Sequence, residues 1–540
     1  MHTLYDGLVA AAQEFPDTAF LCAPPRADRA YLPDGLELSF AQVLSQADAL
    51  AARYAQAGWG IGHRVALALD NHPAHIVHFL ALNKLGVSQV PVTPYYLHHE
   101  LEYLLEHSEA DLAVALPQNE ERLRAAGALP VIGWCDTSTP DGFTPPAPPR
   151  PATGGTPDGA SEIALVYTSG TTSRPKGAII DNAYAFAVGR CYAAHGGALS
   201  LQRGVDRLYL PLPFFHVNAG VNTVATALLT GVCLIVPDRF HAGTWWDDLA
   251  ATRATAFHYL GIIPPVLMAA PKRGDDIKTG LRFGLGAGLD PALHAAFEAR
   301  FGVPMVEVWG MTETGRFLAA CHEPRQTDTR AFGRSMPGHL EARVVDDTGT
   351  EVPVGTLGEL VVRASQRDPR QGFFRGYLKN EAATEEAWRG GWFHTGDVVS
   401  QDATGMLHFT ERSKNMIRRS GENISAAEVE DALIDHPGVA QVAVLPVKDE
   451  MRDEEVMACI VPSDGATGDL AAAQDILSFC RERLAYYKLP AWFQFRAELP
   501  VTGTQKIQKH RLFDAEVDPR HAPGVLDLRD MKSNMRNRQG

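Results

Sequence analysis

The sequence contains few cysteines for its length, and none of them form a closely spaced pair. Seven cysteines are scattered over 540 residues, and no CxxC motif occurs. A disulfide framework needs an even set of cysteines, and a structural zinc site usually needs paired ones. The pattern therefore argues against both kinds of site and predicts reduced thiols in a cytoplasmic compartment.

The sequence also lacks an excess of positive charge. It holds 49 Lys and Arg against 64 Asp and Glu, which gives a formal net charge of −15 at pH 7. A nucleic-acid backbone or an anionic membrane would repel such a chain. We therefore expect no nucleic-acid partner, and any phosphate site must be locally basic or assisted by a metal ion.

Long apolar runs are absent as well. The longest apolar stretch, residues 221–236, is interrupted by Asn222, three threonines and Gly231. It is too short and too polar to span a bilayer and is typical of a buried helix followed by a strand. The first sixteen residues lack a cationic start followed by an apolar core, so we expect neither a signal peptide nor a transmembrane segment.

What the sequence does contain is an alternation of short apolar runs with helical patterns over residues 60–310. Such an alternation predicts an α/β fold with largely parallel sheets covered by helices. One helix is expected between Pro73 and Gly86, which punctuate its two ends. Strands are expected at residues 64–69, 89–92, 112–116, 208–212, 232–236, 256–260, 281–284 and 305–309.

The pattern changes after residue 330. Segments 341–345 and 357–363 flank an Asp-Thr-Gly turn and predict a small antiparallel unit. Further on, a small α+β domain is expected, with helices at 426–435 and 470–484 and strands at 439–445 and 456–461. The tail after Pro519 carries several arginines and lysines, and we expect it to be frayed.

One loop carries most of the functional information. Residues 167–178, Tyr-Thr-Ser-Gly-Thr-Thr-Ser-Arg-Pro-Lys-Gly-Ala, follow an apolar strand and combine five Ser and Thr hydroxyls with two glycines and two cations. Such a loop can wrap a polyphosphate through its amides, hydroxyls and positive charges. It is not a P-loop, because Pro175 and Gly177 stand where that motif needs a glycine and a hydroxyl residue. The alternative is a polar surface turn, which the length and composition of the loop disfavour.

Four further segments and one lysine accompany this loop in a fixed order. They are Pro211-Leu-Pro-Phe-Phe-His216, Val308-Trp-Gly-Met-Thr-Glu-Thr314, Gly391-Trp-Phe-His-Thr-Gly-Asp397, Arg412-Ser-Lys-Asn-Met-Ile-Arg-Arg-Ser-Gly-Glu-Asn-Ile424, and Lys506 in Thr502-Gly-Thr-Gln-Lys-Ile507. Together they resemble the adenylate-forming superfamily, which comprises acyl-CoA synthetases, nonribosomal-peptide adenylation domains and firefly-type luciferases. The resemblance spans nearly the whole chain.

The resemblance implies an ATP-dependent acid–CoA ligase. A small-molecule carboxylate attacks the α-phosphate of ATP, giving an acyl-adenylate and pyrophosphate, and the thiol of coenzyme A then displaces AMP. The implied cofactors are ATP, Mg²⁺ and coenzyme A. Both steps require charge stabilisation more than covalent catalysis by the protein.

The resemblance also assigns nucleotide contacts. Asp397 is expected to accept the ribose hydroxyls, with Arg412 reaching the same sugar. Glu313 is the expected Mg²⁺ ligand, and Thr312 is expected to donate to the α-phosphate. The phosphate loop would bind through Thr168, Ser169, Gly170, Thr171, Thr172 and Lys176. The other expected nucleotide contacts are Gly286, Ala287, Gly288, Trp309, Gly310 and Met311.

The implied domains are a large N-terminal domain at 1–411, a hinge at 412–415 and a small, mobile C-terminal domain at 416–540. Lys506 would bridge the carboxylate and the α-phosphate during adenylation. The small domain would then swing about Asn415, and Ser420, Gly421 and Glu422 would line the coenzyme A tunnel.

The chain departs from the usual family pattern in four places, which include Trp309 where tyrosine is frequent and Gly286-Ala-Gly-Leu289 where Gly-Gly-Ala-Pro is usual. Asn415 replaces the customary aspartate or lysine of the hinge, so a salt bridge that tunes the swing is absent. Gln505 stands where glycine usually precedes the catalytic lysine, which puts the geometry of that loop in question.

Each candidate residue also has a structural interpretation when taken alone. A lone acid can stabilise the first turn of a helix, a lone lysine is usually solvated, and a lone histidine can be a satisfied core residue. These interpretations apply to Glu313, Lys506 and His216, and Asp397 alone could close a turn. The joint pattern favours the functional assignments, with His216 beside the acyl pocket.

The acyl pocket is expected to form from residues 216–222, 259–262, 286–288 and 310–317. These segments hold small residues and few charges, which favours an uncharged or modest-sized acyl group. Residues 239–261 look most like the crotonobetaine/carnitine-CoA ligase-like branch. The alternatives are an adenylating enzyme that loads a carrier protein and a non-catalytic nucleotide-binding homologue. The oligomeric state stays open, with a homodimer as one option.

Overall fold

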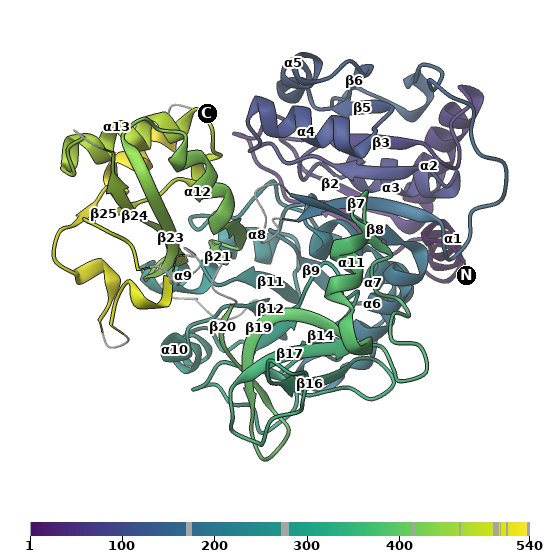
Figure 1. The fold of residues 1–540 in the computed structure, drawn as a ribbon. Coiled ribbons are helices and arrows are strands. Elements are labelled where there is room, and N and C mark those ends of the chain that lie inside the picture. Colours follow the sequence, from purple (N-terminus) through teal and green to yellow (C-terminus); the bar gives the residue numbers. More distant parts are fainter. Residues whose placement is uncertain are drawn as a thin grey trace. The chain divides into compact units, whose positions relative to one another are not determined.

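The computed structural model describes residues 2–168, 175–271, 280–412, 416–463, 466–500, 507, 509–514 and 517–536. The chain divides into two compact units (Figure 1). The large unit comprises Met1–Pro94, His98–Tyr167 and Gly177–Thr410, and the small unit comprises Tyr95–Leu97, Thr168–Lys176 and Glu411–Gly540. Among the described residues, no helix has the length and apolar character that a membrane span requires.

The first sheet of the large unit has seven strands in the order β18-β8-β7-β4-β3-β5-β6. The pairings from β7 to β6 are parallel, whereas β18 joins β8 antiparallel. Helix α5 packs on β5 and β6 (Figure 1). The strands are β3 (Arg64–Ala68), β4 (Ser88–Pro91), β5 (Leu112–Ala115), β6 (Val131–Gly133), β7 (Glu162–Thr168), β8 (Lys176–Asp181) and β18 (Gly376–Tyr377).

The second sheet has eight strands in the order β14-β13-β12-β11-β9-β10-β1-β2. Its six inner strands are parallel, and the edge strands β14 and β2 are antiparallel. The strands are β1 (Ala19–Ala23), β2 (Leu36–Ser39), β9 (Arg207–Tyr209), β10 (Cys233–Ile235), β11 (Ala256–Leu260), β12 (Phe283–Ala287), β13 (Met305–Gly310) and β14 (Phe317–Ala319).

Helices that pack around these two sheets have clear local causes. Helix α2 begins after Ser39, whose hydroxyl accepts from the amide of Gln42 while the Gln42 side chain returns to the Ser39 amide. Helix α3 is buried on every side, as expected for a helix enclosed between layers. The helices of this unit are α1 (Leu4–Glu14), α2 (Phe40–Gln56), α3 (Ala74–Lys84), α4 (His98–Ser108), α5 (Pro117–Ala126), α6 (Asn182–Ala194), α7 (Thr223–Thr230), α8 (Trp245–Ala251), α9 (Ile263–Ala269), α10 (Pro291–Phe301) and α11 (Glu381–Ala387).

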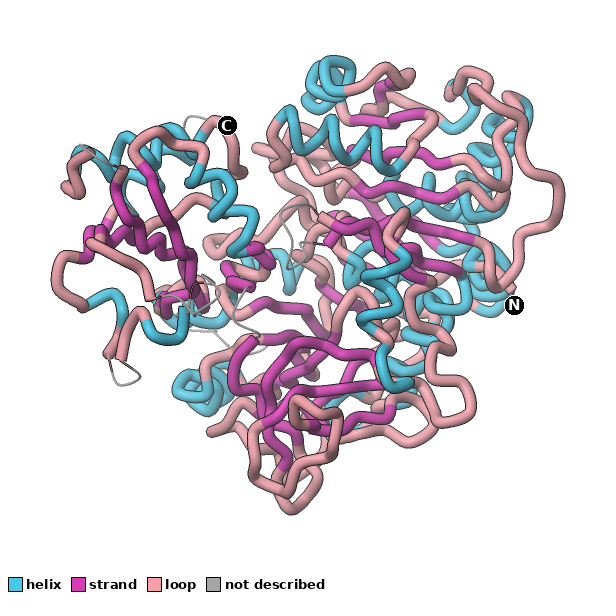
Figure 2. The backbone as a smooth tube through the Cα atoms, viewed as in Figure 1, coloured by secondary structure: helices cyan, strands magenta, loops and turns pink. Residues whose placement is uncertain are grey.

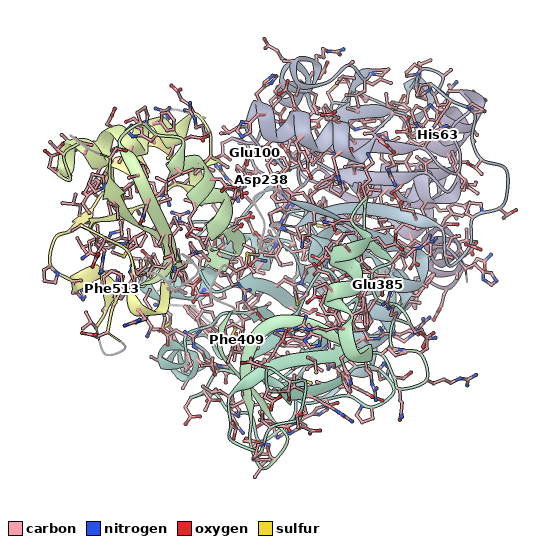
Figure 3. The ribbon with its side chains drawn as sticks, viewed as in Figure 1. His63, Glu100, Asp238, Glu385, Phe409 and Phe513 are labelled. Atoms are coloured by element: carbon pink, nitrogen blue, oxygen red, sulfur yellow. The ribbon has the colours of Figure 1, made fainter. Side chains whose placement is uncertain are left out.

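The third sheet of the large unit is the predicted antiparallel one. Its order is β15-β20-β19-β17-β16, and loops connect most of its strands (Figure 2). Phe409, on β20, packs against the main core (Figure 3). The strands are β15 (Ala331–Gly333), β16 (Glu341–Val345), β17 (Gly358–Arg363), β19 (Phe393–Gln401) and β20 (Leu407–Arg412).

The small unit is an α+β structure around a six-stranded sheet, in which β22-β21-β24-β25-β26 form one path and β23 pairs with β24. Phe513 packs against a hydrophobic cluster of this unit (Figure 3). The elements are β21 (Met416–Arg419), β22 (Glu422–Ser425), α12 (Ala426–Ile434), β23 (Val439–Asp449), β24 (Asp453–Pro462), α13 (Leu470–Arg481), β25 (Trp492–Phe495), β26 (Val525–Asp527) and α14 (Arg529–Arg536).

The predicted α/β class is confirmed, including the parallel-rich sheets, the antiparallel subdomain and the small α+β unit. The predicted frayed tail is wrong for residues 519–536. There β26 pairs with β25, and α14 buries Lys532, which is only 1% exposed. A buried ion pair between Lys532 and Glu455 explains how so charged a segment becomes ordered.

Candidate active site

The carboxyl end of β13 joins two sheets. Trp309 lies on β13, and its indole Nε1 donates a hydrogen bond of 2.7 Å to Oδ2 of Asp397 on β19. Both side chains are buried, Asp397 being 1% exposed. The backbone amide of Asp397 donates to the Thr395 hydroxyl. Asp397, which is expected to bind the ribose, is therefore held in place by Trp309, which belongs to another predicted nucleotide motif.

The same strand end also reaches the seven-stranded sheet. Glu313 follows β13, and its Oε1 accepts a hydrogen bond of 2.8 Å from the Tyr377 hydroxyl on β18. Burial, followed by the negative charge of Glu313, raises the pKa of Tyr377. The tyrosine therefore stays a hydrogen-bond donor, and it orients a carboxylate that is 6% exposed.

The backbone next to these two acids is fixed as well. The Tyr184 hydroxyl donates to the Thr312 carbonyl at 2.8 Å. The Thr314 hydroxyl donates to the carbonyls of Met311 and Arg316. Residues 311–314 therefore form a tight turn immediately after Gly310, the last residue of β13.

The segment Gly286-Ala287-Gly288 is a close crossing of two backbones. A Cβ at Gly286 would lie 2.2 Å from the Tyr259 carbonyl oxygen, and one at Gly261 would lie 2.4 Å from the Gly288 carbonyl oxygen. Any side chain at either position would collide with backbone that cannot move aside. Glycine is required here because the paired strands β11 and β12, and the residues that follow them, run directly beside each other.

Glu307 anchors this crossing and was not predicted from the sequence. Its carboxylate accepts from the amides of Gly288 at 2.9 Å and Leu289 at 3.2 Å, and from the Tyr259 hydroxyl. Burial raises the pKa of Glu307 above its ordinary value. The available signal was a single acid within the apolar run Met305-Val-Glu-Val-Trp309.

His216 lies where β9 has given way to a short π-helix. Its ring centroid is 4.6 Å from that of Phe215, and it is half-buried. The π-helix, Asn218–Asn222, begins two residues later. Asn218 Oδ1 lies 3.2 Å from Nδ1 of His258, whose pKa burial lowers to about 4. π-Helical turns are frequent at functional sites, which agrees with a binding role for this segment.

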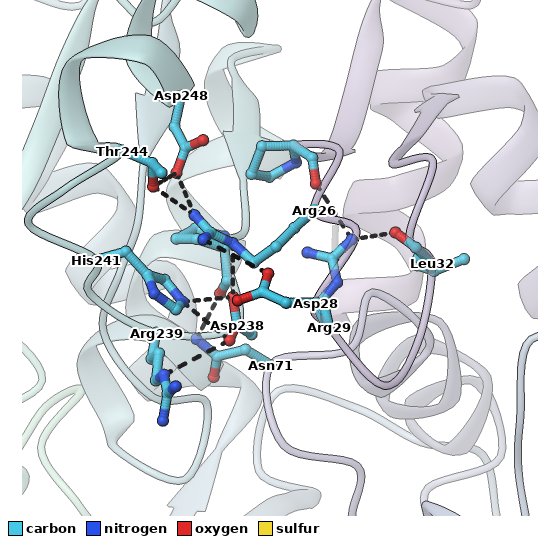
Figure 4. A network of polar contacts seen from close by, with 12 residues as sticks. Arg26, Asp28, Arg29, Leu32, Asn71, Asp238, Arg239, His241, Thr244 and Asp248 are labelled. Carbon is cyan, nitrogen blue, oxygen red and sulfur yellow. Dashed lines mark hydrogen bonds and ion pairs between the residues drawn. The ribbon is translucent and has the colours of Figure 1, made fainter.

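A polar network that was not predicted from the sequence joins residues of the loops after β1, β3 and β10 (Figure 4). Asn71 donates to the carbonyls of Leu212 and Pro237 and accepts from the Phe214 amide, all at about 3 Å. Arg26 forms an ion pair of 2.8 Å with Asp248. These contacts tie the loops that follow β1, β3, β9 and β10 to one another.

The other predicted site residues belong to the small unit, which is described by itself. Thr168 ends β7, Lys176 begins β8 and Arg412 ends β20. Ser420 and Gly421 form the turn between β21 and β22, and Glu422 begins β22. Ser169, Gly170, Thr171, Thr172, Asn415, Gln505 and Lys506 lie outside the described residues.

Comparison with known proteins identifies two matching family models. Residues 8–378 match the AMP-binding enzyme model, and residues 428–506 match the model of the AMP-binding enzyme C-terminal domain. The first match alone covers more than half of the chain. The family is therefore shown, in agreement with the resemblance seen in the motifs.

Individual relatives agree with the family models. The chain is 32% identical to the sulfoacetate–CoA ligase of Cupriavidus necator, over 95% of this chain and 97% of the relative. It is 31% identical to the crotonobetaine/carnitine–CoA ligase of Shigella flexneri, over 84% and 88%. The fold matches an o-succinylbenzoate CoA synthetase from Bacillus subtilis with a TM-score of 0.79 at 23% identity, covering 95% of this chain and 98% of that one.

These findings confirm the predicted enzyme class, together with its use of ATP, Mg²⁺ and coenzyme A at the level of the family. The chain belongs to the AMP-binding enzyme family, and it is an acid–CoA ligase of the adenylate-forming kind.

Proposed function

We propose that this ligase activates a carboxylic acid of small or medium size, whose acyl group carries no charge, as the acyl-adenylate. It then transfers the acyl group to coenzyme A. One observation supports a nucleotide site at the end of β13 above all others. Two buried acids, Asp397 and Glu313, are each oriented by an aromatic donor, Trp309 and Tyr377, from two different sheets. Carboxylates are the side chains suited to accept hydrogen bonds from sugar hydroxyls and to bind a hard cation.

In the proposed adenylation step, Asp397 accepts the ribose hydroxyls and Glu313 is the carboxylate ligand of Mg²⁺. The donor chemistry fits, because Mg²⁺ binds through one or two carboxylates together with substrate phosphates and water. When bound, the ion neutralises charge on the triphosphate. Thr312 donates to the α-phosphate, and the loop of residues 168–176 holds the β- and γ-phosphates through its hydroxyls, amides and Lys176.

Lys506 completes the proposed adenylation site. Its ammonium neutralises the carboxylate and the α-phosphate as these two anions approach each other. The proposal assigns adenylate binding to residues 1–411, a hinge to 412–415 and the lysine-bearing, coenzyme A-facing domain to 416–540. Ser420, Gly421 and Glu422 would contact coenzyme A once the small domain has moved.

The charges around the proposed acyl pocket favour an uncharged acyl group. Apart from Glu313, the one charged side chain in segments 216–222, 259–262, 286–288 and 310–317 is Arg316. Arg316 is buried and donates to the Gln371 carbonyl at 2.7 Å, with its guanidinium over the Phe373 ring. Arg316 is therefore engaged within the fold. A substrate with a sulfonate would require an available cation in the pocket. A substrate with a quaternary ammonium would require an acidic or aromatic cradle.

The test is a panel of acids scored by coenzyme A-dependent AMP release. Straight-chain acids from acetate to octanoate, together with benzoate, represent the proposed class, while sulfoacetate and crotonobetaine represent the charged substrates of the two relatives. The proposal expects kcat/KM to be highest for an uncharged acid. A preference for either charged acid contradicts the proposed substrate class but leaves the enzyme class intact.

Pyrophosphate exchange separates the remaining alternatives. Carboxylate-dependent exchange of labelled pyrophosphate into ATP, without coenzyme A-dependent AMP release, would favour an enzyme that loads a carrier protein. A lack of exchange with every acid would favour a non-catalytic homologue. The proposal further includes a cytoplasmic location, which the cysteine pattern supports, and size-exclusion chromatography tests the homodimer option.

A further inference from the structure

The turn between β21 and β22 has a backbone conformation that needs support. Ser420 has a φ of 52° and Gly421 a φ of 89°, so both residues lie in the left-handed region. Two consecutive left-handed residues form the tight hairpin turn that matches the strand twist. Glycine adopts this conformation freely, but serine does so at a cost. The amide of Ser420 donates to the Arg452 carbonyl at 2.9 Å, which is one source of support.

Arg419, the last residue before this turn, supplies a second source. Its side chain is 5% exposed, and Nε lies 2.9 and 2.8 Å from the two carboxylate oxygens of Glu455 on β24. The guanidinium also lies over the Tyr486 ring, 5.4 Å from its centroid. Arg419 pairs with Asp453 in the sheet, so its backbone and side chain are both held by β24.

The carboxy-terminal helix α14 holds Glu455 from the other side. Lys532 is 1% exposed, and its Nζ donates to Glu455 Oε1 at 2.7 Å and to the Leu489 carbonyl at 2.6 Å. Two cations therefore share one buried carboxylate. Burial, followed by repulsion from Arg419, lowers the pKa of Lys532 to about 7. Keeping an ammonium in such a place is costly, so a general need for stability does not by itself explain it.

We propose that Lys532 is a positioning residue for the Ser420–Gly421 turn and acts through Glu455 and Arg419. The ammonium fixes Glu455 Oε1, so the carboxylate stays in the orientation that Arg419 requires. Without Lys532 the carboxylate can rotate, and Arg419 no longer holds the base of the turn in one place. This inference rests on the proposed function, in which the turn contacts coenzyme A.

The inference makes the two half-reactions respond differently. Adenylation does not use the turn, whereas thioester formation binds coenzyme A beside it. Misplacement of a binding segment by a fraction of an ångström should raise the KM for coenzyme A on the order of tenfold, below the ~100-fold that a whole ångström can cost. Pyrophosphate exchange, which reports adenylation alone, should stay within about twofold of the parent.

The test compares Lys532→Met with Arg529→Met. Arg529 lies on the same helix and pairs with Asp527, so the control removes a cation of α14 without touching Glu455. We expect Lys532→Met to raise the KM for coenzyme A about tenfold and Arg529→Met to leave it unchanged. If Lys532→Met does not fold, Lys532→Leu, which also removes the donor to Glu455, provides the same comparison.

An unchanged KM for coenzyme A in the Lys532 variant overturns the inference. An equal loss in pyrophosphate exchange and in thioester formation also overturns it, because that result indicates general destabilisation. Failure of the proposed function is recognised separately. In that case the parent enzyme itself shows no coenzyme A-dependent AMP release with any acid.

Discussion

Replacing Trp309 with phenylalanine tests the hydrogen bond that orients Asp397. The substitution removes the indole N–H that lies 2.7 Å from Oδ2 and keeps a buried aromatic ring at the end of β13. A hydrogen bond to a charged group contributes about 1.5–3 kcal/mol, which corresponds to roughly 10- to 150-fold in an equilibrium constant. Part of this energy is recovered if the carboxylate finds another orientation, so we expect the lower end, about tenfold.

The loss should appear in ATP binding and not in the chemical step. Asp397 would contact the ribose equally in the ground state and the transition state, so the KM for ATP should rise while kcat changes little. The assay is carboxylate-dependent pyrophosphate exchange at varied ATP concentration. Phe332→Leu is the matched control, because the Phe332 ring lies 6.2 Å from that of Trp309 and takes no part in the bond. An equal rise of the KM in both variants would refute the reasoning, since loosened packing would then explain the effect.

Three further predictions concern the metal ligand, the catalytic lysine and acid stability. Tyr377→Phe removes the hydrogen-bond donor to Glu313, which is expected to bind Mg²⁺. The Mg²⁺ concentration for half-maximal pyrophosphate exchange should rise about 10- to 100-fold, because loss of a group that orients a metal ligand typically has that effect. An unchanged Mg²⁺ titration would contradict the role of Tyr377. Lys506→Ala should abolish adenylation and largely spare thioester formation from supplied acyl-adenylate, and equal loss of both would contradict the assigned role. Five buried histidines have a pKa lowered to about 3 or 4, so the folded chain resists protonation that the unfolded chain accepts below about pH 6.5. The free energy of unfolding should therefore fall as the pH drops from 6.5 towards 4, by up to about 1.4 kcal/mol per histidine and pH unit. Urea unfolding measures this as a falling midpoint, and a constant midpoint would refute it. These histidines are His72, His75, His78, His195 and His258.

Strands buried on both faces were predicted closely, because a continuous apolar run is itself the signal. The strand expected at 256–260 is β11 (Ala256–Leu260), and the strand expected at 112–116 is β5 (Leu112–Ala115). The strand expected at 456–461 is β24 (Asp453–Pro462), which begins three residues earlier. Its first residues are acids, which pair with Arg419 and with β23. Local hydropathy does not reveal partners so distant in the sequence, so these residues were not predicted as part of the strand.

The same reason explains the misjudged tail. Charges in residues 529–536 indicate a solvated segment, yet Lys532 is buried because Glu455, far away in the sequence, receives it. Glu307 and Asn71 were missed because their partners are mostly backbone groups of loops that meet only in the folded chain. The motifs did single out Trp309, Glu313 and Asp397, whose side chains are fixed by hydrogen bonds at one end of β13, although their roles remain proposals.

The carboxyl end of β13, a strand of the eight-stranded sheet, contacts both other sheets of the large unit, and this limits how the enzyme can vary. A slip of one residue in β13 would reverse the side to which each of its side chains points and would shift the turn at 311–314 by about 3.3 Å. Trp309 would leave Asp397, and Glu313 would leave Tyr377, in a single event. Insertions and deletions between residues 305 and 313 should therefore remove nucleotide affinity completely, so variation in substrate preference must arise in the loops around this strand while its length is preserved.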